Sequence, residues 1–159
     1  MSGPRVGFGY DIHRLVPDRR LVLGGLVLEH PSGLVGHSDG DVLLHAVMDA
    51  LLGAAGLGDL GTRFPSDDPA YAGADSQVLL RQVSAMLREA GWRVASLDAT
   101  VVAESPRIGP HAAAMRSAIA TSLGVDPGVV SVKAKTNEGF GPIGAGEAIA
   151  AMAVALVSR

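Results

Sequence analysis

The segment SDGDVLLHAVMDALLGAAG, residues 38–56, specifies the clearest element of secondary structure in the chain. Its apolar residues recur at intervals of three and four over residues 42–55, which is typical of an α-helix. The serine and aspartates before residue 42 can cap the first turn, and Gly56 is suited to end the helix. The segment therefore predicts a helix over residues 42–55 that follows a polar turn.

The flanking sequence predicts strands before this helix and a mixture of helices and strands after it. The expected strands are 5–12, 21–28, 93–103 and 129–136, the expected further helices are 76–90 and 105–123, and the expected Gly-rich loops are 56–75 and 137–146. Gly24 and Gly25 interrupt the second strand and indicate a bulge or hairpin turn. Residues 147–157 fit a helix by their alanine content or a buried strand by their β-branched members. With no repeat and no linker, we expect one α+β domain over residues 1–159.

The composition narrows the class of protein. The 159 residues are 48% hydrophobic but only 4% aromatic, so the core must be built from Ala, Val and Leu. The chain has no cysteine, which excludes disulfides and cysteine nucleophiles and leaves histidine and carboxylates as the metal ligands. A net charge of -3 indicates no broad cationic surface, so we expect no nucleic acid and no membrane as partners. Without a leader or a long apolar run, we expect a cytoplasmic protein.

Three residues in two predicted elements have the chemistry of a metal site. Asp11 and His13 stand two apart on a strand and therefore share a face, although such a pair more often forms a structural hydrogen bond. His45 could complete three protein ligands with one open position, which is the arrangement of a catalytic zinc site. Asp41, His45 and Asp49 recur every four residues and could instead form a solvated, capped helix face. In the metal interpretation, Asp49 could orient His45.

The Gly-rich loops carry groups suited to phosphate. Residues 36–40 precede a helix N-terminus whose free N–H groups favour anions, with His37 and Ser38 as additional donors, although a plain capping turn has the same composition. Two lysines alternate along residues 133–135, and Glu138 could hold a magnesium-type ion. Lysines at a strand edge also discourage aggregation, so this second signal has an ordinary explanation. Neither loop matches a Walker or dinucleotide motif.

Together these motifs resemble the 2-C-methyl-D-erythritol 2,4-cyclodiphosphate synthase family. The matching segments are GYDIH at 9–13, GHSDGDV at 36–42 with His45, GLGDLG at 56–61 and KAKTNE at 133–138, in the family's order and spacing. The resemblance implies an enzyme of non-mevalonate isoprenoid synthesis. It would convert 4-diphosphocytidyl-2-C-methyl-D-erythritol 2-phosphate to 2-C-methyl-D-erythritol 2,4-cyclodiphosphate, a phosphorus–oxygen lyase reaction that releases CMP. It also implies that residues 147–157 form a strand.

The resemblance implies two metal ions and a shared active site. Asp11, His13 and His45 match the ligands of Zn²⁺, and Glu138 matches the ligand of a Mg²⁺ or Mn²⁺ ion that bridges the diphosphate. Family members are homotrimers in which a mixed four-stranded sheet, covered by helices on one face, turns its other face to the threefold axis. Each active site lies between subunits, with the zinc side from one chain and the cytidine side from the next.

The resemblance also implies catalytic and substrate-binding positions. His37 and Thr136 match the residues credited with stabilising the transition state. Asp59 to Gly61 match contacts to the methylerythritol, and residues 103–109 with 134–136 match the cytidine pocket. The full substrate-binding set is Asp11, His13, His37, Ser38, Asp59, Leu60, Gly61, Phe64, Asp68, Ala103, Arg107, Ile108, Gly109, Ala134, Lys135, Thr136 and Glu138.

Several positions depart from the family pattern. Arg107 replaces the usual lysine, which is a mild change, and Lys135 replaces a common threonine. The loop at residues 64–68 shifts an acid from position 66 to 67. Pro142 and Ala145 replace a phenylalanine and an arginine near the threefold axis, which predicts weak binding of isoprenoid diphosphates there. A metal-dependent phosphohydrolase and a non-catalytic diphosphate-binding trimer remain alternatives from other classes.

Overall fold

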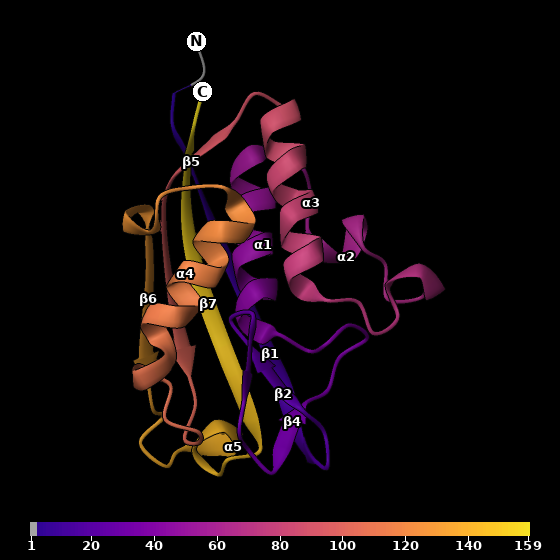
Figure 1. Cartoon of the computed structure of the whole chain (residues 1–159), viewed down its shortest axis with the longest axis vertical. Helices are drawn as coiled ribbons and strands as arrows, with labels where there is room; N and C mark the ends of the chain where they lie inside the picture. Colours follow the sequence, from indigo (N-terminus) through magenta and orange to yellow (C-terminus); the bar gives the residue numbers. More distant parts are fainter. Residues whose placement is uncertain (1–2) are drawn as a thin grey trace.

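The computed structural model describes residues 3–159 and contains a mixed five-stranded sheet with helices on one face (Figure 1). The strand order is β4-β1-β7-β5-β6, and only β5 and β6 are parallel. The sheet strands are β1 (Arg5–Pro17), β4 (Ser32–Leu34), β5 (Arg93–Val102), β6 (Val130–Lys135) and β7 (Ala148–Ser158). Strands β2 (Leu21–Leu23) and β3 (Leu26–Leu28) form a separate hairpin around Gly24 and Gly25, as predicted. Residues 1 and 2 of the predicted domain lie outside the described residues.

The sheet has one strand more than the four expected. Strand β1 runs on to Pro17, beyond the predicted end at Ile12, and its last residues pair with β4 in the register Leu15 to Leu34. The extension therefore creates an edge on which β4 can pair. Residues 148–158 form the long central strand β7, which confirms the expectation for the C-terminal segment.

Three long helices cover one face of the sheet. They are α1 (Val42–Ala55), α3 (Ser76–Glu89) and α4 (Ala112–Leu123), and the shorter turns are α2 (Leu60–Arg63), α5 (Gly141–Gly144) and 3-10 turns at Pro69–Tyr71, Gly109–His111 and Pro127–Val129. Helix α1 has the predicted bounds, with Asp41 at its N-cap and Gly56 at its C-cap. The helix predicted from residue 105 begins only at Ala112, because Pro106 and Pro110 supply no backbone N–H and Pro110 would clash inside a longer helix.

Helix α1 packs almost directly onto strand β1. A Cβ atom added at Gly7 would lie 1.9 Å from the carbonyl oxygen of Ala50, and one at Gly9 would lie 1.9 Å from that of Ala46. Only glycine allows this approach of helix to strand. Because side chains alternate along a strand, Asp11 and His13 continue the same face of β1 toward α1. The two glycines therefore bring His45, the neighbour of Ala46, close to both residues.

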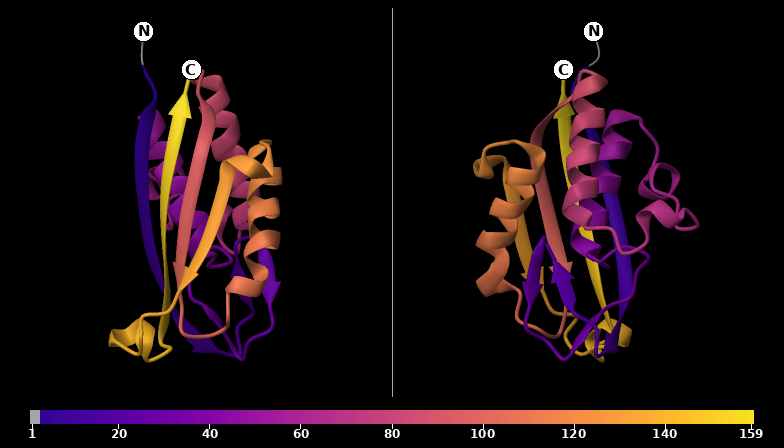
Figure 2. Two further views of the ribbon diagram at one scale, coloured as in Figure 1. Left: turned by 90° about the vertical axis from the view of Figure 1, so that its left-hand side faces the viewer. Right: turned by 45° about the vertical axis from the view of Figure 1, so that its right-hand side comes forward.

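None of the three long helices covers the opposite face of the sheet (Figure 2). Large apolar side chains are exposed on this face. Val6, Phe8, Tyr10 and Ile12 alternate along β1 and are 43% to 68% exposed, and Val154 of β7 pairs with Phe8 and is 43% exposed. A contiguous exposed apolar surface of this kind is typical of an interaction site. Among residues 3–159, none of the helices is both long enough and apolar enough to cross a membrane.

Candidate metal centre and nucleotide cleft

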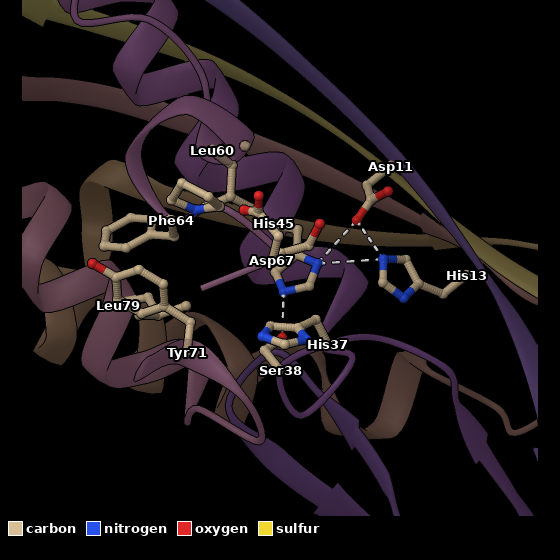
Figure 3. Close-up of a pocket in the computed structure, with 13 residues that line it drawn as sticks. Asp11, His13, His37, Ser38, His45, Leu60, Phe64, Asp67, Tyr71 and Leu79 are labelled. Carbon is tan, nitrogen blue, oxygen red and sulfur yellow. Dashed lines mark hydrogen bonds and ion pairs between the residues drawn. The ribbon is translucent and has the colours of Figure 1, made fainter. Parts of the chain in front are cut away.

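Asp11, His13 and His45 direct three ligand atoms to one point (Figure 3). The Asp11 Oδ2 atom lies 2.8 Å from His13 Nε2 and 3.0 Å from His45 Nδ1, and the two histidine nitrogens are 3.4 Å apart. Zinc bonds of this ligand type, arranged as a tetrahedron, place the donor atoms about 3.3 Å apart. The donor set and its spacing therefore fit a tetrahedral zinc ion with one open position.

The other nitrogen of each imidazole is hydrogen-bonded away from this point. His13 Nδ1 donates to the backbone carbonyl of Val35, and His45 Nε2 lies 3.0 Å from Ser38 Oγ and 3.2 Å from Ser76 Oγ. Such contacts hold the proton on the outer nitrogen and leave the lone pair of the inner nitrogen for a metal. The ligands are thus oriented as metal coordination requires.

The electrostatics of the cluster favour an ionised carboxylate beside imidazoles. Burial raises the pKa of Asp11, but hydrogen bonds from His13 and His45 outweigh it and hold the pKa well below its usual value. Burial lowers the pKa of His13, while the Asp11 carboxylate raises it and prevails. A divalent cation would replace these protons as the partner of the carboxylate.

A cavity of about 580 Å³ opens in front of the three ligands. Of the predicted metal and substrate positions, it is lined by Asp11, His13, His37, Ser38, His45, Leu60, Gly61 and Phe64. It is also lined by Pro65, Ser66, Asp67, Tyr71 and Leu79, which the sequence analysis did not place in the site. The Phe64 and Tyr71 rings pack edge to face with centroids 5.3 Å apart, and so form an apolar wall opposite the ligands.

Two predicted contacts, Asp59 and Asp68, do not line this cavity and cap short helices instead. The Asp59 carboxylate accepts the backbone N–H of Thr62, and the Asp68 carboxylate accepts that of Ala70. The side chain of Thr62, and then its backbone N–H, lower the pKa of Asp59. Of the two acids in the loop at residues 64–68, Asp67 is the one that lines the cavity. In the loop at residues 64–68 an acid stands at position 67 instead of position 66, and this departure from the family pattern was the signal that could have identified Asp67.

The helix stripe of Asp41, His45 and Asp49 is not a solvated face, and Asp49 does not orient His45. Asp41 is fully buried, and its carboxylate accepts the backbone N–H groups of Gly24 and Gly25 as well as that of Leu44. Asp49 accepts the backbone N–H of Leu60 at 2.7 Å and therefore positions α2. The expectation failed because residues four apart on a helix face different neighbours once the helix is packed.

The predicted cytidine positions meet in a second cavity, of about 340 Å³, at the ends of β5 and β6. Its lining contains every predicted position of residues 103–109 and 134–136 except Ser105, and it adds Pro110. The lining residues are Ala103, Glu104, Pro106, Arg107, Ile108, Gly109, Pro110, Ala134, Lys135 and Thr136. The parallel pairing of β5 and β6 explains the meeting, because parallel strands end at the same edge of a sheet. We refer to this cavity as the nucleotide cleft.

Glu138 lies beside this cleft in an unusual backbone conformation. Its φ angle is 51°, in the left-handed region that non-glycine residues seldom adopt and that recurs at functional sites. The Thr136 hydroxyl donates to its carboxylate at 3.2 Å. The carboxylate of Glu104 accepts the backbone N–H of Asn137 at 2.8 Å and that of Gly139 at 3.2 Å. Glu104 therefore braces the backbone on both sides of Glu138, a contact that the sequence analysis missed.

The metal centre and the nucleotide cleft are separated within one chain. The metal ligands begin on β1, whereas the cleft lies at the end of β6, three strands away in the sheet. Neighbouring strands are spaced by about 4.8 Å, so the two elements are about 14 Å apart. The linings of the two cavities share no residue.

Comparisons with known proteins identify similar proteins over nearly the full length. The model of the YgbB family matches residues 4–158. The 2-C-methyl-D-erythritol 2,4-cyclodiphosphate synthase of Thermosynechococcus vestitus is 61% identical over 153 residues, which cover 96% of this chain and 95% of that protein. The enzyme of the same name from Bordetella petrii is 60% identical over 155 residues, covering 98% and 96%.

Solved structures show the same fold. The bifunctional IspDF of Campylobacter jejuni superposes with a TM-score of 0.94 at 39% identity, covering 98% of this chain and 42% of that one. A CDP complex of IspF from Plasmodium falciparum has a TM-score of 0.87 at 33% identity, covering 100% and 98%.

Proposed function

Because this chain belongs to the YgbB family of 2-C-methyl-D-erythritol 2,4-cyclodiphosphate synthases, we propose that its metal centre and nucleotide cleft act together in the cyclisation that defines that enzyme. The chain is a metal-dependent lyase of isoprenoid biosynthesis by the non-mevalonate route. An oxygen of the substrate's 2-phosphate forms a bond to the β-phosphorus of the same molecule. The bond from that phosphorus to the bridging oxygen breaks, and CMP leaves with the electron pair.

The convergence of Asp11, His13 and His45 is the observation that carries the proposal. Attack of one phosphate on another requires that their charges be neutralised and their atoms held in line, and it requires no protein nucleophile. Asp11, His13 and His45 would hold a zinc ion, and Glu138 would hold a Mg²⁺ or Mn²⁺ ion. Both ions would supply positive charge to neutralise the reacting phosphates. The absence of cysteine from the chain is compatible with this chemistry.

The two cavities suggest how the other residues hold the substrate. His37 and Ser38 line the metal cavity just before the N-terminus of α1, where donors favour phosphate. Leu60 and Gly61 line the same cavity and would hold the methylerythritol. In the nucleotide cleft, Arg107 and backbone groups would bind the cytidine and its phosphate, and the Thr136 hydroxyl would stabilise charge that develops on phosphorus.

We further propose a homotrimer whose sheets face the threefold axis. Two observations support it. The first is the uncovered apolar row on β1, formed by Val6, Phe8, Tyr10 and Ile12, and the second is the separation of the metal centre from the nucleotide cleft within one chain. A neighbouring copy that covers the row can bring its cleft to the metal centre of the first chain. Three shared sites would result. The substrate and product are polyanions, which suits a cytoplasmic location.

Product analysis tests the proposed reaction. Purified protein is incubated with 4-diphosphocytidyl-2-C-methyl-D-erythritol 2-phosphate, Zn²⁺ and Mg²⁺, and the products are followed by phosphorus NMR. We expect CMP and a cyclic diphosphate in equal amounts. Release of inorganic phosphate would instead identify a phosphohydrolase, and binding of the substrate without turnover would identify a non-catalytic binding protein.

A further inference from the structure

A buried serine outside the predicted site contacts the most buried metal ligand. Ser76 is the first residue of α3 and is fully buried, and its Oγ atom lies 3.2 Å from His45 Nε2. The same oxygen lies 2.6 Å from Asp39 Oδ1, and the backbone N–H of Ser76 donates to Asp39 Oδ2 at 2.9 Å. Asp39 therefore holds Ser76 by two hydrogen bonds, and Ser76 contacts the histidine.

The direction of these hydrogen bonds follows from the number of protons. A serine hydroxyl has one hydrogen, and an ionised carboxylate can only accept. The short contact from Ser76 to Asp39 therefore uses the hydroxyl hydrogen, and toward His45 the oxygen can only accept. A hydrogen on His45 Nε2 can therefore donate to Ser76. When a metal ion replaces the Nδ1 hydrogen that faces Asp11, this contact keeps the remaining hydrogen on Nε2.

We propose that Ser76 and Asp39 are positioning residues that set the tautomer and orientation of His45 for metal binding. This inference rests on the metal centre of the proposed function and is independent of the identity of the substrate. In many metal sites a carboxylate hydrogen-bonds directly to a metal-bound histidine. Here the Asp39 carboxylate acts through the Ser76 hydroxyl, and we refer to the chain from Asp39 through Ser76 to His45 as the relay. Because Ser76 opens α3, the relay also ties the helix to the metal ligand.

Ser38 contacts the same nitrogen but is held differently. Its Oγ atom lies 3.0 Å from His45 Nε2 and 3.5 Å from Ser76 Oγ, and it accepts the backbone N–H of Gly40 at 3.4 Å. No carboxylate binds its hydroxyl hydrogen among the hydrogen bonds of residues 3–159, and it lines the cavity. Ser38 therefore keeps a hydrogen to donate to a phosphate, whereas Ser76 is committed to His45.

The affinity for Zn²⁺ of the full-length protein tests the proposal, measured by competition with a chromophoric chelator. Loss of a contact of this kind weakens metal binding by about 10- to 100-fold, and we expect Ser76→Ala to do so. The matched control is Ser84→Ala on the same helix, which removes another buried hydroxyl, one bonded to the Leu123 carbonyl far from the ligands. We expect Ser84→Ala to keep the wild-type zinc affinity. Equal zinc affinities in the two variants would overturn the positioning role.

A second measurement needs no variant of the relay. In the zinc-loaded wild-type protein, nitrogen NMR should show His45 coordinated through Nδ1 with a slowly exchanging hydrogen on Nε2, its signals assigned by their loss in His45→Ala. Coordination through Nε2 would overturn the relay even if Ser76→Ala fails to fold. Wild-type protein that binds no zinc would overturn the metal centre itself, and so is distinguishable from failure of the relay alone.

Discussion

The metal centre and the nucleotide cleft differ in how completely one chain builds them. The metal ligands come from β1 and α1, which pack through Gly7 and Gly9, and His45 is only 7% exposed. The cleft is lined by the last residues of β6 and by residues that follow β5 and β6. Most of the lining residues, including Arg107 and Thr136, are exposed. Close packing thus preorganises the metal ligands, whereas the cleft is an exposed surface that a neighbouring copy in the proposed trimer would complete.

The largest effect is expected from His45→Ala at the metal centre. Two ligands would remain, so zinc should be lost and CMP release should fall by about 10³-fold or more. The fold should persist, because the rest of α1 is held by its apolar residues. Zinc content and CMP release are measured, with His111→Ala as the control, since His111 lies outside the metal cluster. Zinc and activity retained by His45→Ala would contradict the ligand assignment.

The second largest effect is expected from a substitution in the apolar row of β1. Through this row a neighbouring copy would bring its nucleotide cleft to the metal centre. Phe8 is 62% exposed at the middle of the apolar row. Phe8→Asp would place a charge in the proposed threefold contact, so we expect monomers and loss of activity with an intact metal centre. Sedimentation velocity and zinc content measure the outcome. A wild-type protein that is monomeric and fully active at micromolar concentration would contradict the trimer.

Mixed trimers test whether the two regions of one site come from different chains. His45→Ala disables the metal centre and Glu138→Gln impairs the side of the site next to the cleft, so neither variant alone has a complete site. In randomly mixed trimers, about a quarter of the shared sites would combine one intact metal centre with one intact partner. Activity should recover accordingly after the two are refolded together. Mixed trimers that mass spectrometry detects but that stay inactive would exclude shared sites.

A smaller and conditional effect is expected from Glu138→Gln alone. The amide is a weaker ligand for a hard cation, so the second ion should bind less tightly while zinc is retained. Raising Mg²⁺ or Mn²⁺ should therefore restore part of the activity by mass action. The measurement is a titration of CMP release with each ion. A defect that no ion concentration relieves would argue against Glu138 as the ligand.

The smallest effect is expected at Glu104, where two substitutions should differ in the Mg²⁺ concentration that activity requires. Glu104→Ala removes the acceptor for the backbone N–H groups of Asn137 and Gly139, so the loop around Glu138 should loosen and require several-fold more Mg²⁺. Glu104→Gln keeps an acceptor oxygen and should remain close to wild type. A Mg²⁺ titration of both variants measures the difference. Equal defects would show that the charge of Glu104 acts rather than its hydrogen bonds.

Much of the fold was predictable because local signals agreed with packing. The helix at 42–55 has matching caps and apolar spacing, and its bounds were confirmed. The residue numbers of β5 and β6 were predicted to within two positions. The late start of α4 was missed because two prolines act over several residues, and β4 was missed because a three-residue strand has no pattern of its own.

The residue types of the candidate site and their order could be predicted before the fold was known, because metal and phosphate chemistry restrict which side chains are useful. Which of these residues meet depends on how the helices and strands pack. This packing separated Asp49 from His45, turned Asp41 into a buried cap, placed Asp67 in the cavity and brought Ser76 to the metal ligand. These contacts join residues 11 to 31 positions apart, through helix and strand packing that local sequence patterns do not encode.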